Sequence, residues 1–283
     1  MYHTEQQGFV TFAQNTDQVD YLKLAYVQAM NVKLTQKHNK FAVIVDKNTL
    51  SYVTDQHRKV FDYVIEITND QSSDSARFAN EWQVFHLTPF KETIKLESDL
   101  LFTRSIDHWW DTFRLRDIVL STGCRNYHDE LSDVRIYRQF FDDNELPDVY
   151  NGLMYFRYSR TAADFFRKAE QVFSNWDDLK DHALKNCRED SPSTDVLYGI
   201  TAQLIGPELC TLPSADFINF VHMKPRINGW QEQSKWFETV QSEVDGDMIR
   251  INNLNQYSPV HYFNKDYITD EMVTEYEFRS GIN

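Results

Sequence analysis

Two carboxylates stand two residues apart in the segment KLESDLLFTRSIDHWW, at the point where an apolar stretch ends. Alternate residues of an extended chain face the same side, so Glu97 and Asp99 can approach one hard divalent cation. A cation held there would neutralise a diphosphate that leaves a substrate. Taken alone, this pattern more often marks a solvated strand end in an acidic protein, so the prediction of a metal site needs support from elsewhere in the chain.

A second motif, FVHMKPRINGW, lies much further along the chain and again places two polar residues, His222 and Lys224, on the same side of an extended segment. Imidazole suits a borderline metal such as manganese, and lysine supplies a compact positive charge for a diphosphate oxygen. An exposed His and Lys in a loop is the alternative. Because the two motifs occur together, we predict a Mn²⁺ or Mg²⁺ site whose ligands are Glu97, Asp99 and His222. Lys224 would then contact the diphosphate.

The first part of the chain has the pattern of alternating strands and helices. Residues 8–13, 41–45 and 60–67 have the apolar composition of buried strands, and residues 21–35 have an amphipathic helical pattern. Such βα-like units favour an open α/β sheet of Rossmann-like construction, in which ligands collect outside the carboxyl ends of the strands. We therefore expect the functional site at that edge of the sheet.

The rest of the chain continues this alternation. Further helices are expected at 76–89, 162–176 and 194–205, and further strands at 93–96, 118–122 and 152–158. Neither GxGxxG nor GxxxxGK[ST] occurs, so dinucleotide-dependent oxidoreductases and P-loop proteins lose their usual support. Without repeats or a linker, residues 1–283 are expected to form one domain, with a nucleotide-binding half at 1–100, an acceptor and donor half at 101–230, and a C-terminal extension at 231–283.

The composition limits the setting of the protein. Its hydrophobic fraction of 41% is enough to fill a sizeable core. Its net charge of −14 argues against a protein that binds a polyanion over its whole surface. Cys124, Cys187 and Cys210 have no metal-type spacing and are expected to be reduced thiols. No apolar run approaches the ~20 residues of a membrane-spanning helix, and the N-terminus lacks a secretory layout. We therefore expect a cytoplasmic protein without a membrane partner, in the host cytoplasm if it is of phage origin.

The order of elements and motifs resembles that of GT-A glycosyltransferases related to the glycogenin-like family, and the chain also resembles glycosyltransferases of tailed phages. The resemblance runs from about Phe9 to Trp230. It implies a GT-A fold, which is a Rossmann-like nucleotide-diphospho-sugar transferase fold with a mostly parallel central sheet. It also implies metal-dependent transfer of a hexosyl or pentosyl group from a nucleotide-sugar, with UDP-sugars favoured and the anomeric configuration retained.

The same resemblance assigns roles to further residues. The nucleotide would lie near the ends of the first two strands, at Thr11, Ala13, Asn15 and Asp46. Lys95, just before the acidic pair, would contact the donor sugar or a phosphate.

Two more residues are assigned to the reacting groups. Asn151 and Asp195 would position the donor sugar and the incoming hydroxyl. Their alternatives are local, because Asn-Gly is a common turn signal and Ser193-Thr194-Asp195 could cap a helix.

The phage resemblance suggests a hydroxymethylated pyrimidine of DNA as one acceptor. Arg125, Arg135 and Arg138 would then hold phosphates, while Trp109 and Trp110 are either a stacking platform or core residues, with the core favoured. The net charge of −14 counts against DNA. The alternatives are a saccharide or protein acceptor, or a non-catalytic nucleotide-sugar-binding protein. A nucleotidyltransferase would be expected to carry a Gly-rich N-terminal loop, and only Gly8 is present there.

Overall fold

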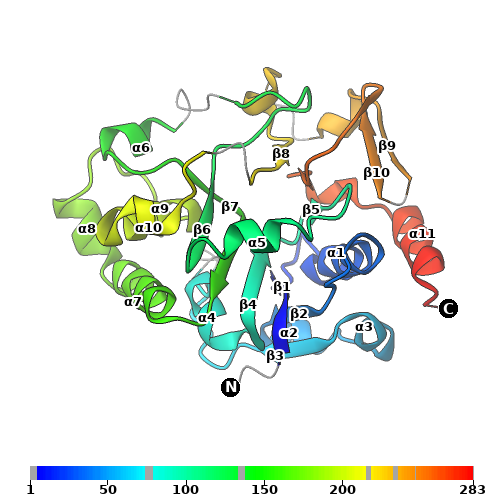
Figure 1. Ribbon diagram of the computed structural model, residues 1–283, viewed down its shortest axis with the longest axis horizontal. Helices are drawn as coiled ribbons and strands as arrows, with labels where there is room; N and C mark the ends of the chain where they lie inside the picture. The colour runs from blue at the N-terminus through cyan, green and yellow to red at the C-terminus, as the bar shows by residue number, and fades with distance from the viewer. Residues whose placement is uncertain are drawn as a thin grey trace.

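The computed structural model describes residues 5–73, 79–132, 138–214, 218–231, 235–245 and 247–282. A six-stranded sheet of order β3-β2-β1-β4-β7-β6 lies at its centre (Figure 1). Strand β7 runs antiparallel to its neighbours β4 and β6, and the other pairs are parallel. The strands are β1 (Glu5–Ala13), β2 (Phe41–Val45), β3 (Tyr63–Glu66), β4 (Phe90–Leu96), β6 (Ile118–Thr122) and β7 (Val149–Arg157). This sheet confirms the α/β prediction.

The longer helices cover both faces of the sheet. They are α1 (Tyr21–Thr35), α7 (Arg160–Ser174), α9 (Thr194–Ile205) and α11 (Asp270–Ser280). Shorter helices are α2 (Lys47–Leu50), α3 (Asp55–Val60), α4 (Val84–Leu87), α5 (Trp109–Phe113), α6 (Gln139–Asp143), α8 (Trp176–His182) and α10 (Pro207–Cys210). The 3₁₀ turns are η1 (Glu81–Gln83), η3 (Pro225–Asn228), η4 (Trp236–Glu238) and η5 (Lys265–Tyr267).

Two hydrophobic clusters hold these layers together. Alternate residues of a strand face opposite sides, and in β1 the side chain of Phe9 enters one cluster while that of Val10 enters the other. The first cluster joins the sheet to α1, α5 and the C-terminal segment, and the second joins it to α7 and α9. The sheet is thus covered on both faces, so polar chemistry is confined to its edges.

A small three-stranded sheet, in the order β5-β12-β8, stands beyond the carboxyl end of β4. Its strands are β5 (Leu100–Leu101), β12 (Val260–His261) and β8 (Val221–His222). Strand β12 pairs antiparallel with β5 and parallel with β8. A second small sheet contains β9 (Ser242–Asp245), β10 (Met248–Ile251) and β11 (Leu254–Asn255). The β5-β12-β8 sheet therefore brings together three segments that are far apart in the sequence.

Six predicted elements differ in their bounds from those observed. The strands expected at 8–13, 93–96 and 152–158 are β1, β4 and β7, and each begins three residues earlier than expected. The helix expected at 76–89 begins outside the described residues, and its described part is η1 followed by α4, which ends before an extended Thr88 because the residue before a proline avoids the helical region. The strand expected at 60–67 is only β3, since Val60 still belongs to α3. The helix expected at 162–176 is α7, and Trp176 begins α8. None of the helices in the described part of the chain is long and apolar enough to cross a membrane.

Candidate functional site

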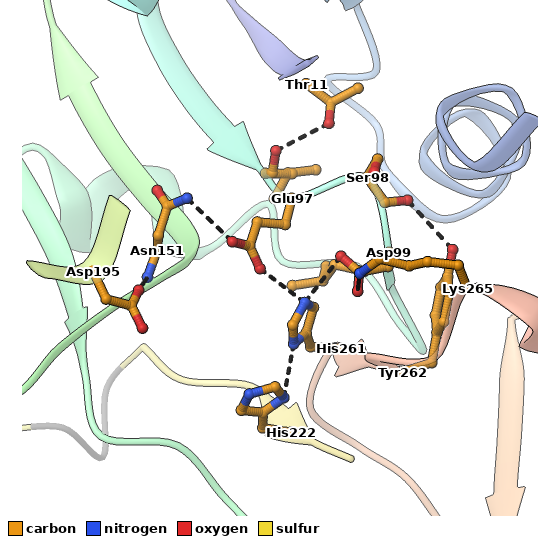
Figure 2. A network of polar contacts seen from close by, with 12 residues as sticks. Thr11, Glu97, Ser98, Asp99, Asn151, Asp195, His222, His261, Tyr262 and Lys265 are labelled. Atoms are coloured by element: carbon orange, nitrogen blue, oxygen red, sulfur yellow. Dashed lines mark hydrogen bonds and ion pairs between the residues drawn. The ribbon is translucent and has the colours of Figure 1, made fainter. Parts of the chain in front are cut away.

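Two carboxylates and an imidazole meet where β4 ends. Glu97 and Asp99 follow the last residue of β4, and His261 lies on β12 with its Cα opposite that of Leu100. The Nε2 atom of His261 is 2.8 Å from Glu97 Oε2 and 2.9 Å from Asp99 Oδ1 (Figure 2). The small β5-β12-β8 sheet thus adds a nitrogen ligand to the acidic pair that was predicted from the sequence.

These three residues fit a divalent cation. Their ligand atoms all lie within 4.8 Å of one another. His261 Nε2 is buried and has no partner in hydrogen-bond geometry, although one oxygen of each carboxylate lies within 2.9 Å of it. Two carboxylate oxygens and one imidazole nitrogen form a donor set that suits Mn²⁺ and tolerates Mg²⁺. Glu97, Asp99 and His261 therefore form a candidate divalent metal site.

Positive side chains surround the acidic pair. Burial favours the neutral form of Asp99, but His261 and an ion pair with Lys265 lower its pKa well below the ordinary range. Burial also opposes the charge on His261, yet Asp99 and Glu97 raise its pKa to about 9. The carboxylates therefore stay ionised and can serve as ligands.

His222, which the sequence predicts as a ligand, lies behind His261. Its Nδ1 atom is 2.7 Å from Nδ1 of His261, on the side of that ring away from the carboxylates (Figure 2). Burial, together with the neighbouring His261 and Lys224, lowers the pKa of His222 well below its ordinary value. A buried, neutral imidazole at this position contacts the candidate ligand His261.

Lys95 is a buried residue that connects several residues of the site. Its side chain has no exposed surface and forms an ion pair with Glu81, which lies on η1. Lys95 Nζ also donates a 3.0 Å hydrogen bond to Asn151 Oδ1, and Asn151 Nδ2 donates to Glu97 Oε1 at 3.2 Å. Asn151 can reach Glu97 because β7 is antiparallel to β4, which places the first residues of β7 beside the last residues of β4.

Asp195 lies in the first turn of α9, next to Asn151. Its Oδ1 accepts a 2.6 Å hydrogen bond from the backbone N–H of Asn151. Burial raises the pKa of Asp195 above its ordinary value, although the Arg138 guanidinium opposes this shift. Arg138 is buried and binds Asp148 at 2.6 Å. The structure thus brings Asp195 and Asn151, the two predicted catalytic residues, into direct contact.

One cavity adjoins this network, and a second cavity shares one lining residue with the first. A cavity of about 220 Å³ is lined by aromatic and apolar residues together with the acidic pair and its neighbours: Phe12, Gln14, Tyr21, Glu81, Leu96, Glu97, Ser98, Asp99, His261, Phe263 and Lys265. A second cavity of about 390 Å³ is polar, and its lining includes Asn15 and Asp46. The two cavities therefore differ in character, one mainly apolar and one polar, and Gln14 contributes to both linings.

The predicted nucleotide residues lie in different surroundings. Asp46 caps α2, where its carboxylate accepts a 2.6 Å hydrogen bond from Thr49 N–H. Asn15 accepts a 2.8 Å hydrogen bond from Leu22 N–H. Thr11 and Ala13 are completely buried, and the Thr11 hydroxyl donates to the carbonyl of Leu96. Asn15 and Asp46 therefore reach a cavity, whereas the side chains of Thr11 and Ala13 help to hold the strand.

Lys224 and the predicted acceptor residues have different surroundings. Lys224 precedes η3, and its ammonium group is 5.7 Å from the centre of the Phe263 ring. Trp109 and Trp110 are buried in the core, which confirms the favoured interpretation. Of the three arginines that were expected to hold phosphates, Arg138 is buried and Arg135 lies outside the described residues. Arg125 donates to Asn219 Oδ1 and to the carbonyl of Asp129.

Sequence reasoning missed His261, Lys265 and Glu81. Strand β12 has only two residues, so His261 carries no periodic pattern that could identify it. Lys265 follows a few residues later, in a polar segment that looks like an ordinary loop. Glu81 lies in the region 76–89, which the sequence predicts as one helix. A histidine next to a short apolar pair, as in SPVHYF, is the only signal for this part of the site, and it is weak.

A mainly parallel sheet with one antiparallel strand, and an acidic pair at the carboxyl end of β4, define the GT-A fold, which confirms the fold prediction. Solved structures of the galactosyltransferase LgtC share this fold. The complex of LgtC with donor and acceptor sugar analogs has a TM-score of 0.54 and 14% identity, over 97% of this chain and 94% of that chain. The structure of an active-site mutant of LgtC has a TM-score of 0.53 and 13% identity, over 97% of this chain and 95% of that chain.

Other comparisons add less. The apo form of mouse xyloside xylosyltransferase 1 has a TM-score of 0.45 and 13% identity, over 73% of this chain and 85% of that chain. No protein-family model and no curated protein sequence matches the chain. The resemblance to the glycogenin-like family and to phage proteins stays a prediction.

Proposed function

We propose that this protein is a metal-dependent glycosyltransferase that moves a sugar from a nucleotide-sugar donor, a UDP-sugar in the first instance, to an acceptor hydroxyl. One observation carries the proposal: the Glu97–Asp99–His261 group opens into a cavity at the carboxyl end of β4, in a GT-A fold. Ligands of open α/β sheets bind at this edge. The likeness to LgtC supports the donor class through the fold.

The proposed roles follow from charge and position. Glu97, Asp99 and His261 would hold Mn²⁺ or Mg²⁺, and the bound cation would supply positive charge against that of a departing diphosphate. Lys265 lines the same cavity and can turn from Asp99 to a phosphate oxygen once the carboxylate is shared with a cation. Lys224 is half-buried, and burial lowers its pKa, so an anion nearby would favour its charged form.

The donor sugar would lie above the Asn151–Asp195 contact. Asp195 holds the backbone of Asn151, while the Asn151 side chain is held by Lys95 and Glu97. A carboxylate and an amide fixed in this way can orient sugar hydroxyls with little loss of conformational entropy on binding. The polar cavity lined by Asn15 and Asp46 would hold the nucleoside.

A saccharide or protein hydroxyl is the acceptor that the charge distribution favours. The net charge is −14, and neither Arg138, Trp109 nor Trp110 is available to a polyanion, because all three are buried. Contacts to DNA phosphates need exposed basic residues. Hydroxymethylated DNA therefore enters the test below as the less favoured acceptor.

The test is release of nucleoside diphosphate, or of CMP, from a panel of UDP-, GDP- and CMP-linked sugars with and without Mn²⁺. Saccharides, peptides and hydroxymethylcytosine DNA are added separately. We expect Mn²⁺-dependent release from one donor, accelerated by a saccharide or peptide. Binding of a donor with no release under any condition would instead indicate a non-catalytic nucleotide-sugar-binding protein. If only the hydroxymethylcytosine DNA accelerated release of the nucleotide, DNA would be the acceptor.

A further inference from the structure

Two buried histidines face each other through the same ring atom. His222 lies on β8 and His261 on the adjacent β12, and their Cα atoms are directly opposite in the parallel register. The Nδ1 atoms are 2.7 Å apart, and the ring centres are 4.4 Å apart. At 2.7 Å the contact is a hydrogen bond, so one of the two nitrogens carries a proton and the other accepts it.

The surroundings of His222 fix the direction of its ring. Its backbone N–H donates to the carbonyl of Arg125 at 2.9 Å, and its carbonyl accepts from Asn228 Nδ2 at 2.9 Å. The rings of Tyr150, Phe220 and Phe263 surround the imidazole. This apolar surface restricts rotation of the ring, so the Nδ1 atom of His222 remains directed at His261.

The proposed metal site decides which tautomer of His261 is required. A neutral imidazole has one N–H, and a nitrogen that binds a metal must present its lone pair. Since Nε2 of His261 faces Glu97 and Asp99, the proton of a metal-bound His261 must reside on Nδ1. The Nδ1–H group is buried and needs an acceptor, and Nδ1 of His222 is the atom in reach.

We propose that His222 is a positioning residue, which accepts the Nδ1–H of His261 and thereby sets the affinity of the Glu97–Asp99–His261 site for a divalent cation. This inference rests on the proposed function only for the identity of the site as a metal site. Partners that orient a metal-bound histidine typically contribute 10–100-fold to metal affinity. His222 thus acts through His261 and does not itself bind the cation.

The test compares two variants of His222 by calorimetric titration of the full chain with Mn²⁺. In His222→Asn, the side-chain oxygen can take the place of Nδ1 and accept the same proton, whereas His222→Leu has a similar size and no acceptor. We expect His222→Leu to weaken Mn²⁺ binding by about 10–100-fold and His222→Asn to stay within about threefold of the wild type. Circular dichroism of the metal-free variants checks that both are folded.

Three results would overturn the proposal. If His222→Asn lost Mn²⁺ binding as completely as His261→Ala does, His222 would itself be a ligand; if His222→Leu bound Mn²⁺ like the wild type, it would have no role. If His222→Leu does not fold, ¹⁵N NMR of the wild type with bound Cd²⁺ takes its place. We expect the spectrum to place the proton of the His261 ring on Nδ1. A proton on Nε2 would contradict the proposal. A wild type that binds Mn²⁺ but releases no diphosphate rejects the proposed function alone.

Discussion

At the scale of single residues, the site depends on one buried ion pair. Lys95 has no exposed surface, and its charge is balanced by Glu81 on η1 while it holds the amide of Asn151. A buried charge that loses its partner is strongly unfavourable, whereas replacing both members with neutral groups is often close to neutral. This pair therefore stabilises Asn151, and through it Glu97, before any ligand arrives.

A double-mutant comparison tests this role. We expect Lys95→Met to lower the free energy of unfolding by about 3–5 kcal/mol, because Glu81 stays buried without its partner. The double variant Lys95→Met with Glu81→Gln should recover most of that loss. Urea denaturation measures both. A Lys95→Met variant within about 1 kcal/mol of the wild type would show that Glu81 does not need the ammonium group.

Some of the site residues were predictable and others were not, for a physical reason. Glu97 and Asp99 were found because both follow the same strand and their spacing alone implies a shared direction. His261 was missed because it reaches them only through pairing between β12 and β5, which depends on contacts between distant segments. Whether a lysine such as Lys95 lies beneath a site or inside it also depends on packing, which the sequence alone does not show.

At the scale of elements, two of the long helices and two of the buried strands were the most predictable parts. The bounds of α1, β2, β6 and α9 agree with the patterns at 21–35, 41–45, 118–122 and 194–205. These elements are long enough, or apolar enough, for local periodicity to define them. The two-residue strands β5, β8 and β12 have no such pattern, yet they assemble the candidate metal site.

The close packing of β1 between β2 and β4 leads to a prediction about Gly8. A Cβ atom at this position would lie 2.4 Å from the Phe90 ring and 2.8 Å from the carbonyl oxygen of Lys40. The backbone oxygen cannot move without shifting β1 or the segment before β2, so Gly8→Ala should destabilise the protein by about 1–3 kcal/mol. The exposed Gln6→Ala on the same strand is the control, expected within about 0.5 kcal/mol. Equal melting temperatures for the two variants would contradict this packing.

At the scale of the whole molecule, the C-terminal segment completes the site. The sequence predicts residues 231–283 as an extension, but His261 and Lys265 both belong to this segment. Helix α11 attaches the segment to α1, through the ion pair of Lys23 with Asp270 and the hydrogen bond from Tyr26 to Glu277. The first strands and the last fifty residues therefore contribute to the same cavity.

The central claim is that a divalent cation at the acidic pair drives sugar transfer, and Asp99 tests it most directly. The measurement is Mn²⁺-dependent release of nucleoside diphosphate by Asp99→Asn, with Asp164→Asn on α7, whose side chain is 48% exposed, as the matched control. Because Asp99 is both a proposed ligand and isosteric with Asn, we expect the variant to keep its fold and lose at least about 10²-fold in rate. The control should retain wild-type activity. A folded Asp99→Asn variant with wild-type, Mn²⁺-dependent release would contradict the proposed site.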